Sequence, residues 1–360
     1  MAKIGTSSIT TDEGGIHREA LVKLGGDVGG LRRSGHEVIV VTSGAIAAGL
    51  PALGWASGRP SDVVTLQAAS AVGQSRLMAV YDSVLSGEGL VGGQVLLAPL
   101  DFSHRSQYLH ARDTLGRLLE LGVVPVINEN DAVADDEIRF GDNDRLAALV
   151  ANLVAAELLV LLTDTPGVLS ADPRLDPGAS LIAEIVAVDR ALEAVAGGRG
   201  SERGSGGMAS KLAAAKIASW SGVRTVIASA ERPGVLAAAV ADDPDVGTVV
   251  RPRERRLAAR KLWIAFALRP LGSVVVDDGA RRALTHHPTS LLAAGVVAVK
   301  GRFAPQDAVE ICGADGEVFA KGLATMASTE VSDLAGLRTQ DHGGPSSVVV
   351  HRDDLVTVPA

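Results

Sequence analysis

Residues 38–49 read Val-Ile-Val-Val-Thr-Ser-Gly-Ala-Ile-Ala-Ala-Gly, and this stretch decides the fold class. Its first four residues form a continuous apolar run with the length of a buried strand, and small residues typical of a loop and a helix start follow directly. An apolar run without alternation indicates a strand covered on both faces, as in a parallel sheet between helices. The order of strand, small polar loop and helix is therefore the pattern to look for along the chain.

This pattern recurs through about the first 250 residues. Further apolar runs with strand character stand next to helical patterns at residues 95–97, 123–127, 158–162 and 225–227. The stretch Leu146–Leu162 is the most membrane-like, but it carries Asn152 and Glu157, so it indicates a buried helix followed by a buried strand. The alternation predicts an α/β fold with a mostly parallel sheet between helices, whose ligands bind beyond the carboxyl ends of the strands.

Length and composition limit the class of protein. A chain of 360 residues favours two domains, and an apolar content of 47% is that of a globular protein. The net charge of −8 argues against a protein whose main role is to bind nucleic acid or an anionic membrane. The single cysteine, Cys312, excludes a disulfide within the chain and a zinc site built on cysteines, and it fits a reducing cytoplasm.

The composition changes after about residue 250. Residues 251–261 carry six Arg and Lys against one Glu, and short β-like runs punctuated by Gly, Asp and Pro follow. We predict a large α/β domain at residues 1–250, a basic linker at 251–268 and a small β-rich domain at 269–360. Because residues 271–360 have a net charge of −4, we do not expect the small domain to bind RNA.

Two clusters of acids and amides follow the predicted strands. Residues 128–131 read Asn-Glu-Asn-Asp, and residues 141–144 read Gly-Asp-Asn-Asp before a helix. A turn with a helix cap explains one such side chain but not three in a row. Carboxylates gathered at one sheet edge repel one another, so we expect a cation among them: an amino-acid ammonium group, a lysine or a metal ion.

A Gly- and Ser-rich segment at residues 197–207 leads into a helix that begins near Met208. The segment is either a flexible linker or a phosphate-binding loop, whose backbone N–H groups and helix dipole would attract an anion. Lys211 lies in the first turn of this helix, where the dipole disfavours a cation, and a bound phosphate would remove that conflict. A P-loop would require glycines at the positions of Ser205 and Ser210, so this is not a P-loop.

Two other loops next to predicted strands are candidates for binding an anion. Lys3 precedes a Gly-Thr-Ser loop, and only two residues stand before it, so either its strand is short or the sequence is truncated ahead of it. Ser43 follows the run at residues 38–41, where it either caps the next helix or lets the backbone approach an anionic group.

Taken together, the motifs resemble the glutamate 5-kinases, a family with the amino acid kinase fold, in the long form that ends in a PUA domain. The similarity runs nearly from end to end. It is carried in the large domain by VTSGAIAAG (41–49), AVGQSRL (71–77), VPVINENDAV (124–133), GDND (141–144), LLTDTPGV (161–168) and SGGMASK (205–211), and in the small domain by VDDGARRAL (276–284), SLLAAGV (290–296) and VVVHRDDL (348–355).

The resemblance implies that ATP and Mg²⁺ are used to phosphorylate the side-chain carboxylate of L-glutamate, giving L-glutamyl 5-phosphate in the first step of proline biosynthesis. It implies that Ser43, Asp131 and Asn143 bind glutamate, and that the catalytic residues are Lys3, Lys211 and Asp144, with Asp144 orienting the lysines. The implied ATP site comprises Lys3, Thr163, Asp164, Ser205, Gly206, Gly207, Met208, Ala209, Ser210 and Lys211, and no side chain is assigned to a metal. Also implied are a homo-oligomer, a downstream glutamyl-phosphate reductase as partner, a cytoplasmic location and no membrane association.

Three alternatives stay open at the level of sequence. The chain could be a kinase of the same fold that acts on aspartate, N-acetylglutamate, carbamate or a nucleoside monophosphate, although residues 127–131 and 141–144 argue against this. It could bind RNA through its tail, but the negative charge of the tail argues against this. It could be a regulatory relative without activity, but both lysines and the acidic positions are present.

Overall fold

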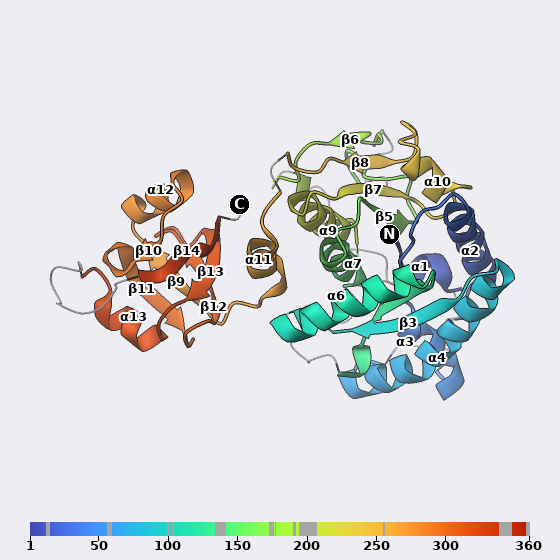
Figure 1. Ribbon diagram of the computed structural model, residues 1–360, viewed down its shortest axis with the longest axis horizontal. Helices are drawn as coiled ribbons and strands as arrows, with labels where there is room; N and C mark the ends of the chain where they lie inside the picture. Colours follow the sequence, from blue (N-terminus) through green and yellow to red (C-terminus); the bar gives the residue numbers. More distant parts are fainter. Residues whose placement is uncertain are drawn as a thin grey trace. The chain divides into compact units, whose positions relative to one another are not determined.

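The computed structural model describes residues 1–11, 15–55, 60–98, 101–102, 104–133, 142–172, 176, 178–189, 192–193, 207–254, 256–337 and 348–357. The chain forms two compact units, Met1–Arg256 and Leu257–Ala360, which we term the first and second unit (Figure 1). The first unit is built on a mostly parallel sheet between helices and the second is rich in strands, so the predicted fold class is confirmed.

The first unit contains an eight-stranded sheet whose central strands coincide with the predicted apolar runs. Every neighbouring pair is parallel except β7 and β8, which are antiparallel. In spatial order the strands are β3 (Gly92–Leu97), β4 (Val124–Glu129), β2 (Val40–Val41), β1 (Ala2–Ile4), β5 (Leu158–Thr163), β7 (Arg224–Ser229), β8 (Thr248–Val250) and β6 (Glu184–Ile185).

Helices cover both faces of this sheet because the order in which strands are added changes at β3. From β1 to β3 successive strands lie toward one edge of the sheet, and after β3 they lie toward the other edge. Crossovers between parallel strands are right-handed, so a change of direction moves the connecting helices to the other face. One face carries α2 (Arg18–Arg33), α4 (Val63–Gly87) and α10 (Val235–Val240), and the other carries α6 (Arg105–Glu120), α7 (Asn143–Leu153) and α9 (Met208–Trp220). The described residues of the unit also form short helices: α1 (Thr6–Ile9), α3 (Ala45–Gly49), η1 (Pro51–Leu53) and η2 (Asp131–Val133).

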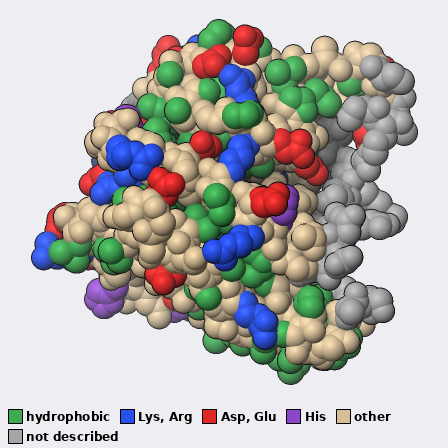
Figure 2. All heavy atoms as spheres, turned by 90° about the vertical axis from the view of Figure 1, so that its right-hand side faces the viewer, with side chains coloured by type: hydrophobic (Ala, Val, Ile, Leu, Met, Phe, Trp, Pro, Cys, Tyr) green, Lys and Arg blue, Asp and Glu red, His purple; other side chains and the backbone are tan. Residues whose placement is uncertain are grey.

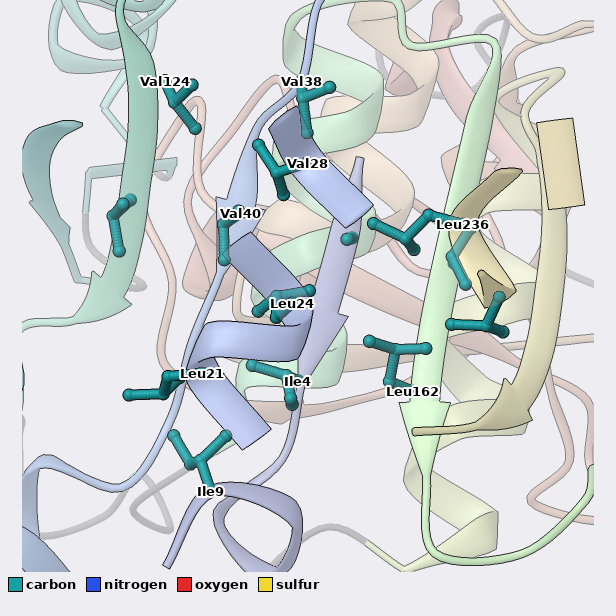
Figure 3. Close-up of a cluster of buried hydrophobic side chains, with 14 of the residues drawn as sticks. Ile4, Ile9, Leu21, Leu24, Val28, Val38, Val40, Val124, Leu162 and Leu236 are labelled. Atoms are coloured by element: carbon teal, nitrogen blue, oxygen red, sulfur yellow. The ribbon is translucent and has the colours of Figure 1, made fainter. Parts of the chain in front are cut away.

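The core on the α2 side shows how each strand divides its side chains between the two faces. Leu21, Leu24 and Val28 of α2 lie over the strands in Figure 3 and are at most 4% exposed. They pack in one cluster with Ile4 of β1 and Leu162 of β5. Because side chains alternate along a strand, the residue before Ile4 faces the opposite side, toward α7 and α9. That residue is Lys3.

The strand register brings the carboxyl ends of the central strands to one edge of the sheet. Lys3 pairs with Val41 on one side and with Leu161 on the other. Beyond β2 the chain turns at Gly44, whose φ of +92° is in the left-handed region that favours glycine. The loops after β1, β2, β4 and β5 therefore meet at this edge, as the sequence pattern predicts.

The described part of the second unit is a six-stranded sheet accompanied by short helical segments. Its order is β10 (Leu291–Leu292), β14 (Val348–Thr357), β13 (Val318–Ala324), β12 (Ala308–Cys312), β9 (Gly272–Val276) and β11 (Val296–Gly301). The helices α11 (Ala259–Leu262), α12 (Asp278–His286) and α13 (Ser328–Leu334) accompany it, with a π-helical turn at Trp263–Ala267 and a 3-10 turn at Ala293–Gly295. The unit has a core of its own that includes Val274, Ile311 and Val349, all completely buried.

The segment at residues 251–268, for which we expected a basic linker, contains the boundary between the two units after Arg256. The Arg253 guanidinium stacks on Trp220 within the first unit, 3.9 Å from the ring centroid. Leu262 and Ile264 are at most 2% exposed, and Ile264 packs in a cluster with Leu323 of the second unit. The basic residues lie at 251–261 and an unbroken apolar run follows at 262–268, and this run helps to close the second core.

None of the helices in the described ranges is both long and apolar enough to cross a membrane. The stretch Leu146–Leu162 forms most of α7 and β5, so the prediction of a buried helix followed by a buried strand is confirmed. On the face shown in Figure 2, the described Lys and Arg side chains are interspersed with Asp and Glu. That face therefore does not present the extended basic surface that binds a nucleic-acid backbone.

Candidate active site

Lys3 is a buried cation at the carboxyl end of the central strand β1. Its neighbours in the strand, Ala2 and Ile4, pack in the apolar cluster on the α2 side, so the lysine points to the side of α7. The residue is only 4% exposed. Since a buried ammonium group requires a partner, the side of α7 must supply a negative charge.

The start of α7 supplies that charge. Asp142 caps the helix by accepting a hydrogen bond from the Arg145 N–H at 3.1 Å, which fixes the position of the first turn. Asn143 and Asp144 occupy this turn and are buried, Asp144 at 1% exposure. The N-terminal end of a helix also favours a carboxylate through its dipole.

The start of α9 brings a second lysine to the same place. Gly207 is the N-cap residue of α9, and Lys211 in its first turn is 5% exposed. The Ser210 hydroxyl donates to Asp142 Oδ1 at 2.7 Å and so joins the first turn of α9 to the cap of α7. The N-terminal ends of two helices therefore converge on one point.

One carboxylate holds both lysines. Asp144 Oδ1 lies 2.7 Å from Lys3 Nζ, and Asp144 Oδ2 lies 3.2 Å from Lys211 Nζ. We call Lys3, Asp144 and Lys211 the Lys–Asp–Lys triad. The predicted cation among the acidic clusters is thus found, and it is a pair of lysines. Asp144 also offsets the unfavourable position of Lys211 at the helix N-terminus.

The pKa values of Lys3 and Asp144 are both lowered, for different reasons. Burial lowers the pKa of Lys3 below the usual lysine value, and the Asp144 carboxylate opposes this only in part. Burial by itself raises the pKa of Asp144, but the ammonium groups of Lys3 and Lys211 outweigh it and leave that pKa below its usual value. The triad carries one net positive charge when both lysines are protonated, and such a buried charge is suited to an anion such as a phosphoryl group.

The three residues expected to bind glutamate are buried at the same edge. Ser43 follows β2 and is 7% exposed. Asp131 lies in η2 and accepts a hydrogen bond from the Ser70 hydroxyl at its Oδ2 atom, at 2.7 Å. Asn143 is next to the triad in α7, and its Oδ1 accepts from the Glu129 N–H of β4 at 3.1 Å. The loops after β2 and β4 therefore adjoin the first turn of α7.

The residues expected to bind ATP, as far as the structure describes them, lie at the end of β5 and the start of α9. We call this the β5 flank of the triad. Thr163 ends β5, is 6% exposed and donates to the exposed Asp164 at 3.1 Å. Gly207, Met208, Ala209 and Ser210 lie at the start of α9 beside Lys211. Ser205 and Gly206 are outside the described residues, as is Gly141 of the second acidic cluster.

A cavity of about 810 Å³ adjoins the β5 flank, but no residue of the triad lines it. Thr163 and Asp164 line it, together with Ile4, Lys23 and Val235 among others. Ile4 faces the α2 side of the sheet, whereas Lys3 faces α7, so the cavity and the triad lie on opposite faces of β1.

The sequence analysis assigned no role to a row of polar side chains on α4, although one of them, Gln74, lies in the motif at residues 71–77. Ser70, Gln74 and Tyr81 belong to the buried face of this helix. Gln74 bonds the Asn128 side chain, and the Tyr81 hydroxyl donates to Thr42 Oγ1 at 2.8 Å. The available signal was their spacing, since all three occupy core positions of an otherwise apolar helix face.

Comparisons with known proteins agree with this architecture. The model of the amino acid kinase family matches residues 2–229, and that of the PUA domain matches residues 272–341. The chain is 44% identical to the glutamate 5-kinase of Pelobacter propionicus over 363 residues, which cover 99% of this chain and 97% of that protein. It is 45% identical to the glutamate 5-kinase of Trichlorobacter lovleyi over 366 residues, which cover 98% and 95%.

Among solved structures, the carbamate kinase from Giardia lamblia bound to AMP-PNP is similar to the first unit in fold. The likeness has a TM-score of 0.50 at 17% identity and covers 70% of this chain and 97% of the carbamate kinase. At 17% identity this likeness supports the fold of the first unit and says nothing about its function.

Proposed function

The chain belongs to the amino acid kinase family and, within it, to the glutamate 5-kinases, and from this we propose that it transfers the γ-phosphoryl group of ATP to the side-chain carboxylate of L-glutamate. The products are ADP and L-glutamyl 5-phosphate, and the reaction is the first step of proline biosynthesis. The observation that carries the proposal is the buried Lys–Asp–Lys triad between the first turns of α7 and α9.

The acceptor requires no general base. A side-chain carboxylate is already ionised at neutral pH, so one of its oxygens can attack the γ-phosphorus directly. The attack forms a carboxylate oxygen–phosphorus bond and breaks the bond from the phosphorus to the oxygen that bridges the β- and γ-phosphates. The electron pair of that bond leaves with ADP, and no proton is transferred.

The difficulty of this reaction is electrostatic, because an anion must approach a polyanion. Phosphoryl transfer is accelerated mainly by positioning and by neutralisation of charge. Lys3 and Lys211 supply two ammonium groups within reach of one carboxylate, and we propose that they neutralise the transferring phosphoryl group. Asp144 holds them apart and in place, so they do not need to reorganise during the reaction.

Mg²⁺ would neutralise the phosphates further when bound with the nucleotide. The described part of the chain contains no group of three or more His, Cys, Asp or Glu side chains that could hold a metal ion. In kinases Mg²⁺ is usually held by one or two carboxylates together with substrate phosphates, so the residues present fit this ion. The candidates to hold it are two exposed carboxylates: Asp142, which accepts from Ser210 at the start of α9, and Asp164, which follows β5.

The direct test is acceptor-dependent release of ADP, with hydroxylamine present to trap an acyl phosphate as the hydroxamate. We expect ADP and hydroxamate in equal amounts with L-glutamate. Aspartate, N-acetylglutamate, carbamate and a nucleoside monophosphate serve as competing acceptors. Turnover with one of these and none with L-glutamate would overturn the proposal.

Asp131→Ala and Asn143→Ala should each raise the KM for glutamate and leave the KM for ATP unchanged. We propose that they bind the ammonium and α-carboxylate groups of the substrate, which keep their charges throughout the reaction. Loss of one hydrogen bond to a charged group corresponds to an increase of about 10- to 100-fold. Asp113→Ala, on the exposed face of α6, is the matched control. A raised KM for ATP with an unchanged KM for glutamate would place these residues at the nucleotide instead.

As the pH is raised, the activity should fall at a pH below the usual pKa of lysine. The folded pKa of Lys3 is lowered, so its ammonium group is present below that pKa and is lost as the pH rises through it. Lys3→Arg keeps its charge in this range and should move the alkaline limb of log kcat to higher pH. Circular dichroism over the same range separates deprotonation from unfolding, and an unmoved limb in Lys3→Arg would assign it to another group.

A fragment that ends at Arg256 should fold and phosphorylate glutamate. The triad and all other described candidate residues lie in the first unit, and each unit has its own core. Circular dichroism and glutamate-dependent ADP release of residues 1–256 are compared with those of the full chain. A folded fragment without activity would show that the second unit contributes to the active site.

A further inference from the structure

Helix α4 runs beneath the loops that carry the proposed glutamate site. It crosses the short helix α3 so closely that a Cβ atom on Gly73 would lie 1.8 Å from the Ala45 carbonyl oxygen. This approach holds the adjacent residue, Gln74, beside the carboxyl ends of the central strands. One turn earlier, Ser70 donates to Asp131, so the same helix already contacts one proposed substrate residue.

A chain of hydrogen bonds runs from Gln74 to a second proposed substrate residue, Asn143. Gln74 Oε1 accepts from Asn128 Nδ2 at 2.8 Å, and Asn128 Oδ1 accepts from the Glu129 N–H at 2.9 Å. The same N–H donates to Asn143 Oδ1 at 3.1 Å. Gln74, Asn128 and Asn143 are 8%, 1% and 3% exposed, so water does not compete for these bonds.

The Gln74 amide is held at a cost to stability. Its Nε2 atom is buried, and among the described residues it has no hydrogen-bond partner. An unpaired buried donor disfavours the folded state, and an apolar side chain of the same length would avoid that penalty. A role in packing alone therefore does not account for glutamine at this place.

We propose that Gln74 is a positioning residue of the glutamate site. Its carbonyl oxygen fixes the Asn128 carboxamide, and the Asn128 carboxamide and Asn143 share the Glu129 N–H. The orientation of Asn143 toward the substrate thus depends on Gln74. The inference rests on the proposed function, because the readout is the affinity for glutamate.

The test is Gln74→Met, which keeps the length of the side chain and removes its polar atoms. We expect the KM for glutamate to rise about tenfold, the effect of losing one buried hydrogen bond. The KM for ATP should be unchanged, kcat should stay within about threefold, and the urea midpoint should be equal or higher. Gln94→Met, on the exposed side of the edge strand β3, is the control and should change none of these.

A double-mutant cycle separates positioning from general disturbance. In the Asn143→Ala background, Gln74→Met should add little to the KM for glutamate, because the residue that it positions is gone. A full tenfold increase in that background, or an unchanged KM in the single variant, would overturn the proposal. If neither Gln74→Met nor the shorter Gln74→Leu folds, Gln74 serves stability and the proposal is likewise overturned. Failure of the proposed function is distinct, since the unaltered protein would then show no glutamate-dependent ADP release.

Discussion

Lys211→Ala should lower kcat about 10²–10³-fold while the protein remains folded, the usual effect of removing one group that stabilises transition-state charge. Lys211 is 5% exposed at the first turn of α9, with its Nζ 3.2 Å from Asp144. Its removal leaves Asp144 paired with Lys3, so the buried carboxylate keeps a counter-charge and the fold keeps its ion pair. The loss therefore falls on the reaction and not on the free energy of unfolding.

The measurement is kcat at saturating ATP and glutamate, with circular dichroism to verify the fold. Lys216→Ala is the matched control, because Lys216 lies on the same helix and pairs with Glu193 away from the triad. Its kcat should stay within about twofold of the unaltered protein, since such partly exposed pairs contribute little. A kcat of Lys211→Ala within about threefold would remove this lysine from the mechanism, since that factor is less than 1 kcal/mol of barrier.

Asp144→Asn should have the largest effect on stability. It leaves two buried ammonium groups without a counter-charge, and breaking a buried pair in this way costs about 3–5 kcal/mol. The free energy of unfolding in urea measures the loss, with Asp82→Asn on the exposed side of α4 as control. Activity should fall too, because the lysines are no longer held in place.

A triple variant separates the two roles of Asp144. Lys3→Met, Asp144→Leu and Lys211→Met together replace the whole triad by apolar side chains, which is often neutral or stabilising. We expect the stability to return and the activity to stay absent. If Asp144→Asn is as stable as the unaltered protein, the lysines are not charged in the folded state, which would contradict the electrostatic mechanism.

The central strands could be predicted from sequence because they are buried on both faces and appear as apolar runs. The run at residues 38–41 was expected to be a strand throughout, but only Val40–Val41 pairs as β2. These two residues pair with β1 on one side and with β4 on the other. Val38 and Ile39 are buried as expected but lie outside the paired segment, so an apolar run marks the buried residues and not the exact ends of a strand.

The family resemblance implied that Asp144 orients Lys3 and Lys211, whereas the residues taken by themselves anticipated the Lys–Asp–Lys triad only in part. Repulsion among the carboxylates predicted a cation, but the local sequence could not say that Lys3 and Lys211 would share Asp144, because this depends on how β1, α7 and α9 pack. Gln74 was missed since its partner Asn128 lies 54 residues away in sequence. Such contacts follow from the crossing of helices, which no local pattern records.

The position of β1 in the middle of the sheet has a consequence for biosynthesis. The strand that carries Lys3 leaves the ribosome well before its partner β5, which begins at Leu158, and before the second lysine, Lys211. At the usual rate of translation, roughly 10–40 s separate the two lysines. A nascent chain that ends before Leu158 therefore leaves β1 with β2 as its only partner strand. One that ends between β5 and Lys211 has the centre of the sheet but only one of the two lysines that Asp144 pairs with, so the charge arrangement of the site is completed after its scaffold.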